Sequence, residues 1–87
     1  MPYRVIFQPS AARQVRALSP ELYRRIIAKA ESLAANPRPA GCEKLKGMDA
    51  TWRVRVGDYR VIYEIRDEVL VVLVVRIGHR RDVYRGR

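Results

Sequence analysis

Three arginines, Arg53, Arg55 and Arg60, occupy the non-core positions of a stretch that is typical of two short strands. Residues 52–56 alternate apolar and basic side chains, so a strand there directs both of its arginines to the same face. The Gly-Asp loop at 57–58 is typical of a two-residue hairpin with glycine at its first position. This hairpin places Arg55 directly opposite Arg60, a like-charge pair that is unfavourable in a sheet. We therefore expect this face to bind an anion.

A second group of residues that could take part in catalysis or binding follows the last apolar strand: His79, Arg80, Arg81 and Tyr84. His79 is the only histidine and can transfer a proton near neutral pH, while Arg80 can stabilise charge on a phosphate. Tyr84 can stack on a base or take part in proton transfer. An even number of loop residues before the last strand puts His79 on the same face as Arg60. Arg81 is either solvated or in contact with an RNA backbone.

Candidate metal ligands are scarce in this sequence, which limits the kinds of reaction that it could catalyse. There is no acidic cluster to hold magnesium, and no histidine pair or thiol set to hold zinc. Cys42 is the only cysteine, so an internal disulfide is excluded. We therefore predict no metal and no cofactor. Three arginines that stabilise a pentacovalent phosphate, next to a proton-transfer group, favour RNA cleavage in which the 2′-hydroxyl is the nucleophile.

The charge of the chain favours a polyanionic partner. Its 87 residues include 18 basic and nine acidic side chains, which give a net charge of +9 and a pI near 10.6. Nucleic acid, an anionic membrane and an acidic protein are all compatible with that charge. Arginine is far commoner here than lysine, and its planar donor fork binds phosphate in a bidentate manner. The composition therefore favours phosphate recognition.

The length fits one domain, residues 1–87, with one modest core. Residues 1–20 carry charges throughout and lack the apolar segment of a signal peptide. The longest apolar run, residues 69–75, is too short to span a bilayer as a helix. We therefore expect a cytoplasmic protein without membrane contact.

Two helices and a sheet are expected to position the arginines. Residues 3–7 alternate as a short strand, and Ser10 is expected to cap a helix over residues 11–18. The Ser-Pro-Glu sequence at 19–21 starts a second helix, whose apolar stripe ends before Pro37. That stripe must be buried, and the core face of the sheet is the available surface.

A connector over residues 37–51 leads from the helices into the hairpin. Leu45 is expected to anchor it to the core, while Lys44 and Lys46 are either solvated or in contact with phosphate. The run over residues 69–75 is apolar on both faces, which is typical of a central strand. The predicted fold class is α+β: an N-terminal strand and an αα-hairpin on one face of a curved antiparallel sheet of about four strands, followed by a short C-terminal segment.

The chain resembles the RelE-like toxins of bacterial and archaeal toxin–antitoxin systems. The resemblance rests on the Leu45–Gly47 connector, the strands Trp52–Arg55 and Tyr59–Tyr63, and the closing segments Val75–Arg80 and Val83–Tyr84. In this order and spacing, the motifs cover nearly the whole chain. The resemblance implies a ribosome-dependent endonuclease that cuts mRNA in the ribosomal A site without a metal. It also implies a RelB-like antitoxin partner, partly disordered, that wraps around the toxin.

Carried over by position, the resemblance assigns phosphate stabilisation to Arg60, a further basic position to Arg80, and catalysis or base stacking to Tyr84. Arg53 and Arg55 stand where well-studied members have lysines. Because arginine does not lose its proton in proteins, these two side chains can stabilise charge but cannot act as a base. Proton transfer then falls on the C-terminal group.

Two alternatives stay open at the level of the sequence. The general base is either His79 or Tyr84. The protein is an mRNA-cleaving toxin, a relative of the ParE toxins that act on DNA gyrase without nuclease chemistry, or a non-catalytic module that binds RNA or the ribosome. The arginine-rich face favours the first of these functions.

Overall fold

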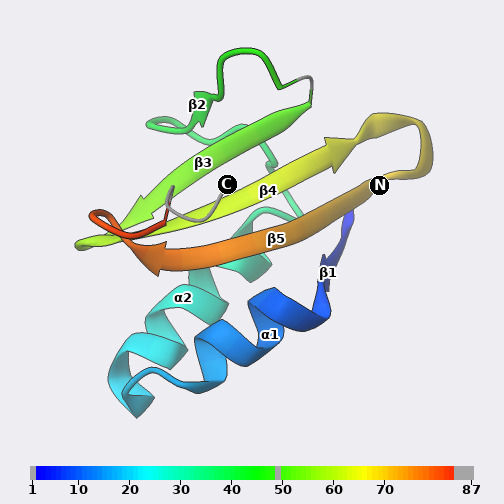
Figure 1. Ribbon diagram of the computed structural model, residues 1–87. Helices are drawn as coiled ribbons and strands as arrows, with labels where there is room; N and C mark the ends of the chain where they lie inside the picture. Colours follow the sequence, from blue (N-terminus) through cyan, green and yellow to red (C-terminus); the bar gives the residue numbers. More distant parts are fainter. Residues whose placement is uncertain (1, 49, 84–87) are drawn as a thin grey trace.

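The computed structural model describes residues 2–48 and 50–83 and shows two helices packed on one face of a five-stranded sheet (Figure 1). The elements follow the chain in the order β1 (Arg4–Phe7), α1 (Pro9–Arg16), α2 (Pro20–Ser32), β2 (Glu43–Lys44), β3 (Thr51–Val56), β4 (Tyr59–Arg66), a 3-10 turn (Asp67–Val69) and β5 (Val71–His79). In space the strands are ordered β1-β5-β4-β3-β2, which makes β4 the central strand.

The predicted α+β architecture is confirmed, with two differences in the sheet. Strand β1 pairs with β5 in parallel, so the sheet is mixed rather than wholly antiparallel. Parallel neighbours need a long connection, and here the helices and three strands lie between them. The sheet also has five strands rather than about four, because Glu43 and Lys44 of the connector pair with Arg53 and Trp52.

The two helix starts differ in how they are capped. The Ser19 hydroxyl accepts a hydrogen bond of 3.3 Å from the backbone N–H of Leu22, which confirms the predicted start of α2. The prediction that Ser10 caps α1 is wrong, because α1 begins at Pro9 and its N-cap is Gln8. Proline has no N–H to leave unsatisfied and has a preset φ, so it favours the first helical position.

The core lies between the helices and the sheet. It comprises the following buried residues: Ala11, Val15, Ile26, Ala30, Leu33, Val54, Val56, Val61, Tyr63, Ile65, Val72, Val74 and Ile77. Tyr63 is fully buried, and its hydroxyl donates a hydrogen bond of 2.8 Å to the carbonyl oxygen of Pro37. Burial raises the pKa of Tyr63, so this hydroxyl stays protonated and keeps the connector fixed to the core.

The opposite face of the sheet carries no helix among the described residues (Figure 1). We call it the arginine face, since Arg53, Arg55, Arg60 and Arg76 belong to it by their pairing register. Leu45 was expected to reach the core, but it lines a hollow on the arginine face instead. Within the described ranges, neither helix is long and apolar enough to cross a membrane.

Candidate functional site

The hairpin of β3 and β4 has the register that the sequence predicts. Val56 pairs with Tyr59 across the two-residue loop, and Arg55 pairs with Arg60. Gly57 has a φ of 59°, a conformation that glycine adopts without the steric cost of a side chain. The two guanidinium groups therefore belong to one face, one pair away from the loop, and form the centre of the candidate site.

Arg60 is held against its own strand. Its Nη1 donates to the carbonyl oxygens of Tyr59, at 3.2 Å, and of Gly57, at 3.5 Å. Neither acceptor is a carboxylate, so these bonds position the guanidinium without neutralising it. Arg60 therefore keeps its charge available for an anion on the arginine face.

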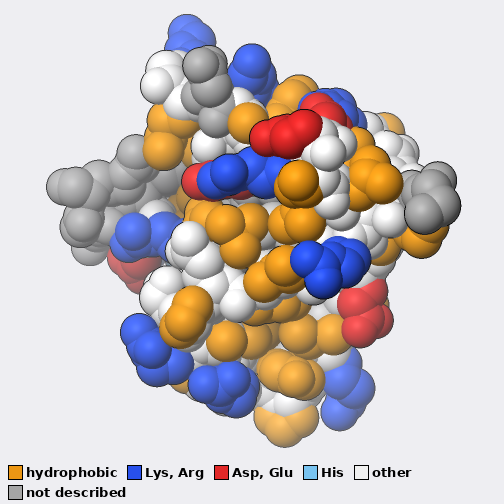
Figure 2. Space-filling model, turned by 90° about the vertical axis from the view of Figure 1, so that its right-hand side faces the viewer, with side chains coloured by type: hydrophobic (Ala, Val, Ile, Leu, Met, Phe, Trp, Pro, Cys, Tyr) orange, Lys and Arg blue, Asp and Glu red, His pale blue; other side chains and the backbone are white. Residues whose placement is uncertain are grey.

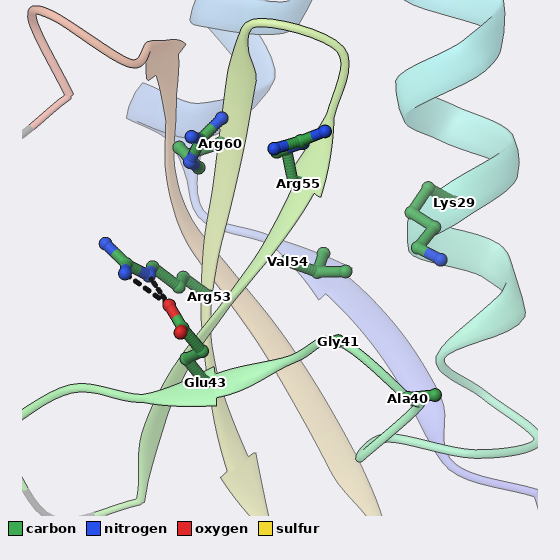
Figure 3. Close-up of a pocket in the computed structure, with 8 residues that line it drawn as sticks. All are labelled: Lys29, Ala40, Gly41, Glu43, Arg53, Val54, Arg55 and Arg60. Atoms are coloured by element: carbon green, nitrogen blue, oxygen red, sulfur yellow. Dashed lines mark hydrogen bonds and ion pairs between the residues drawn. The ribbon is translucent and has the colours of Figure 1, made fainter.

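Arg53 differs from its neighbours because it has a carboxylate partner. Its Nε lies 2.7 Å from Oε1 of Glu43, and its Nη2 binds the same oxygen. Figure 3 shows Arg53 directed toward Glu43 of β2, with Arg55 and Arg60 nearer the hairpin loop. Glu43 was not singled out in the sequence because β2 has only two residues and shows no alternation. Part of the charge of Arg53 is therefore offset.

A cavity of about 370 Å³ joins these arginines to α2. It is lined by Lys29, Ala40, Gly41, Glu43, Arg53, Val54, Arg55 and Arg60 (Figure 3). Lys29 approaches from the helix side of β3, whereas the arginines belong to the other face. The sequence pattern gave no reason to bring Lys29 near the arginines.

A β-bulge in β5 decides where the histidine lies. Ile62 pairs with Arg76 and the next residue, Tyr63, pairs with Val74, so Val75 has no partner on β4. The extra residue reverses which face the following positions occupy. His79 consequently pairs with Tyr59 and does not lie on the face of Arg60.

The prediction that His79 shares a face with Arg60 is therefore wrong. The imidazole packs edge-on against the ring of Tyr59, with centroids 5.6 Å apart and an interplanar angle of 81°. Its Nδ1 accepts a hydrogen bond of 3.1 Å from the backbone N–H of Arg81. These contacts hold the imidazole between Tyr59 and the turn that follows β5.

The chain turns back over the arginine face after β5. The N–H groups of Asp82 and Val83 both donate to the carbonyl oxygen of His79, at 2.8 and 2.9 Å. Val83 is buried and packs on Gly78, where an added Cβ would lie 3.3 Å from the Val83 Cα. Since Gly78 pairs with Arg60, the turn lies beside the arginine pair. Tyr84 is the next residue in the chain and lies outside the described residues.

The remaining basic residues predicted for the site lie at its margins. Arg80 is exposed, its backbone N–H donates to the carbonyl oxygen of Asp58 at 2.7 Å, and its Nε lies 3.9 Å from the Asp58 carboxylate. Arg81 is exposed too. Lys44 and Lys46 are exposed and line a shallow hollow that includes Arg53, so they lie beside the arginine face.

Arg76 was missed by sequence reasoning. It pairs with Ile62, which in turn pairs with Arg53, so the three residues form one row across the arginine face. The neighbouring row consists of Arg55, Arg60 and Gly78. The position of the bulge was the missing information, because it alone decides that Arg76 faces outward on this side.

Positive charge is dispersed on the side of the molecule that Figure 2 shows. Figure 2 views the molecule from the right-hand side of Figure 1, and lysine and arginine side chains there are separated by hydrophobic and acidic ones. Among the described residues, no group of three or more histidine, cysteine or acidic side chains is placed to hold a metal ion. The guanidinium groups of the arginine face offer hydrogen-bond donors and positive charge to an anion.

Comparison with known proteins agrees with this arrangement. A family model described as "ParE toxin of type II toxin-antitoxin system, parDE" matches residues 5–84. The chain is also 34% identical to "Toxin RelG" of Mycobacterium tuberculosis over 98% of its own length and 99% of that protein. The chain belongs to the RelE-like toxins of the RelE/ParE superfamily. As a RelE-like protein it is a toxin of a type II toxin–antitoxin system.

This RelE-like toxin is also similar to a further relative and to chains of two solved structures. It is 28% identical to the "mRNA interferase toxin RelE" of Escherichia coli, with 97% of this chain and 92% of that protein covered. A chain of the toxin–antitoxin complex RelBE2 from Mycobacterium tuberculosis superposes with a TM-score of 0.80, at 30% identity, with 91% of this chain and 99% of that one covered. A chain of the archaeal RelE-RelB complex from Pyrococcus horikoshii superposes with a TM-score of 0.82, at 28% identity, over 95% and 100% of the two chains.

Proposed function

We propose that this RelE-like toxin is an endoribonuclease that cleaves mRNA in the ribosomal A site and so inhibits translation. The observation that carries the proposal is the pairing of Arg55 with Arg60 across the hairpin, on a face that lacks a covering helix among the described residues. Two like charges in register are unfavourable unless an anion lies between them. The name of the Escherichia coli relative, an mRNA interferase, supports RNA as the source of that anion.

The proposed reaction needs no metal. The 2′-oxygen of one ribose forms a bond to the neighbouring phosphorus while the bond to the 5′-oxygen breaks, which leaves a cyclic phosphate and a 5′-hydroxyl. Negative charge builds on the phosphate oxygens in between, and Arg55 and Arg60 stabilise it. Arg53, partly offset by Glu43, and Arg80 bind the flanking backbone.

Proton transfer is assigned to Tyr84 in this proposal. The base must take the proton of the 2′-hydroxyl, and the leaving 5′-oxygen must receive one. Tyr84 follows Val83, which packs on Gly78 beside Arg60. His79 belongs to the other face of the sheet, and its Nδ1 is engaged by the backbone of Arg81.

The proposed partners follow from the relatives. Structures of related chains are toxin–antitoxin complexes, which supports a RelB-like antitoxin, partly disordered when free, as the inhibitor of this toxin. The exposed basic residues Lys44, Lys46 and Arg81 are proposed to contact RNA of the ribosome or the message. Access to translating ribosomes places this activity in the cytoplasm.

Mapping of mRNA 5′ ends after induced expression tests the proposal. Wild-type toxin should arrest growth and produce new ends inside translated codons, and co-expression of the antitoxin should prevent both effects. Arg60→Ala should abolish the cuts. Arg66→Ala is the matched control, because Arg66 is an exposed arginine at the far end of the same strand. Growth arrest with DNA damage and no new mRNA ends would refute the proposal and favour a ParE-like action.

A further inference from the structure

The hollow that Leu45 lines on the arginine face lies one register row away from Arg60. It has a volume of about 240 Å³. Its walls are the aliphatic side chains of Leu45, Ile62 and Val75, and its polar rim includes Glu64 and Arg76. Ile62 is two positions from Arg60 on β4, which is about 7 Å along a strand.

The bulge creates this hollow. In a regular strand Val75 and Arg76 would point to opposite faces, but at the bulge both line the same hollow. The loop after β2 supplies Leu45, whose N–H donates to the carbonyl oxygen of Thr51 at 2.9 Å and fixes its position. An apolar surface with two charged groups at its rim is therefore built into the fold.

We propose that this hollow binds a nucleobase that carries an exocyclic amino group, in the RNA strand whose phosphate lies at Arg55 and Arg60. This inference rests on the proposed function and adds a base preference to it. The volume is below the 300 Å³ or so typical of sites for drug-sized ligands, so a single planar base is a suitable occupant. Single-stranded RNA is read by bases that leave the stack and enter such sites.

Glu64 supplies the selectivity. Nε and Nη2 of Arg66 both contact its Oε1, at 3.1 and 2.5 Å, so neither of these bonds uses Oε2. An ionised carboxylate only accepts hydrogen bonds, and an exocyclic amino group is the donor that it can select. Adenine, cytosine and guanine have that group, whereas the only base donor that uracil offers to a carboxylate is its ring N3–H. The guanidinium of Arg76, on the same rim, can donate to a ring nitrogen or stack on the base.

Glu64→Gln tests the assignment, because glutamine has the same shape but can also donate. Purified wild-type toxin should cut mRNA on programmed ribosomes with a deficit of uracil at one fixed position next to the cut. Glu64→Gln should reduce that deficit about tenfold, the factor expected for one hydrogen bond to a charged group. The position of the cut within the codon should not move.

Two matched controls isolate the effect. Arg66→Gln removes the ion pair with Glu64 but leaves the carboxylate in place, and Glu68→Gln removes an exposed carboxylate on the 3-10 turn. Both should keep the wild-type base pattern. Thermal melting of each variant verifies that it is folded before cleavage is compared.

The failures of the two proposals are distinguishable. No cleavage by folded wild-type toxin would refute the proposed function and this inference with it. Cleavage with an unchanged base pattern in folded Glu64→Gln would overturn the inference alone. If the same variant instead loses affinity for the antitoxin, the hollow belongs to a protein partner, and the base site is again refuted.

Discussion

At the scale of single residues, the pairing of Arg55 with Arg60 is the feature that folding alone does not explain. Like charges that face each other across strands destabilise a sheet, and neither guanidinium is paired with a described carboxylate. By contrast, Arg53 is paired with Glu43. A destabilising pair on a sheet face is expected where ligand binding, rather than folding, determines the residue types.

Arg55→Thr should raise the stability of the protein and lower its RNA-cleaving activity. Threonine favours strands, and its introduction removes the repulsion, so we expect the free energy of unfolding to rise by about 0.2–1 kcal/mol. The gain should shrink at high salt, which screens the repulsion between exposed charges. Urea unfolding at low and high salt measures it. The variant should also cleave RNA more slowly than wild type at both salt concentrations. A stability lower than that of wild type at low salt would contradict the proposed repulsion.

A second charged cluster, Tyr3, Arg38 and Asp67, has a structural role far from the arginine pair. The Arg38 Nη2 lies 2.8 Å from Oδ2 of Asp67, and the Tyr3 hydroxyl donates to Oδ1 at 2.5 Å. The hydrogen bonds from Arg38 and Tyr3 hold the pKa of Asp67 below its ordinary value of 3.8. The cluster ties the start of β1 and the connector to the turn before β5.

Asp67→Asn should lower the melting temperature in a pH-dependent way. Because the pKa of Asp67 is lower in the folded state, its stabilisation is fully present above pH 3.8 and is lost as the pH falls through the folded-state value. The melting temperatures of wild type and variant should therefore differ near neutral pH and converge in acid. A difference that persists unchanged in acid would show that Asp67 acts through its shape rather than its charge.

At the scale of the elements, the sequence pattern of each strand decides which parts of the fold can be predicted. The hairpin was predicted correctly because strict alternation and the Gly57-Asp58 loop leave one register. The bulge at Val75 could not be predicted, because it lies in a run that is apolar on both faces and carries no mark of parity. Because of this one extra residue, His79 lies on the face opposite to the predicted one. For the same reason, nothing in the sequence pattern indicated that Arg76 belongs to the arginine face. The short strand β2 lacks the length for any periodicity.

Ser10 and Ser19, each near the start of a helix, make a matched pair of substitutions. Ser19→Ala removes the cap of α2 and should cost about 1 kcal/mol of folding free energy. Ser10→Ala should cost little, because Ser10 lies inside α1 and the N-cap there is Gln8. Thermal or urea unfolding of both variants measures the difference. Equal losses would contradict the different positions of the two serines.

His79→Gln tests the face assigned by the bulge. Glutamine can still accept the hydrogen bond from the Arg81 N–H, so the C-terminal turn should be kept. We expect the cleavage rate to stay within a few-fold of wild type and its dependence on pH to stay the same. A large loss of activity in the folded variant, with a changed dependence on pH, would return the base role to His79.

At the scale of the whole molecule, a net charge of +9 is distributed around a sheet whose two helices, in the described part of the chain, lie on the same face. The helices bury one face in the core, and the other face carries Arg53, Arg55, Arg60 and Arg76 in two neighbouring rows. Such a surface attracts any polyanion over a long range, with an affinity that falls steeply with salt. Selectivity must then come from the close contacts of the arginine face.

The most direct test of the central claim is the single-turnover rate of mRNA cleavage on programmed ribosomes, for purified wild type, Arg60→Ala and the control Arg66→Ala. Removing one preorganised donor to a charged transition state typically lowers the rate by about 10²–10³. We predict a loss of that size for Arg60→Ala with unchanged folding, and a rate near wild type for Arg66→Ala. Equal rates for wild type and folded Arg60→Ala would contradict the assignment of the arginine face as the catalytic surface.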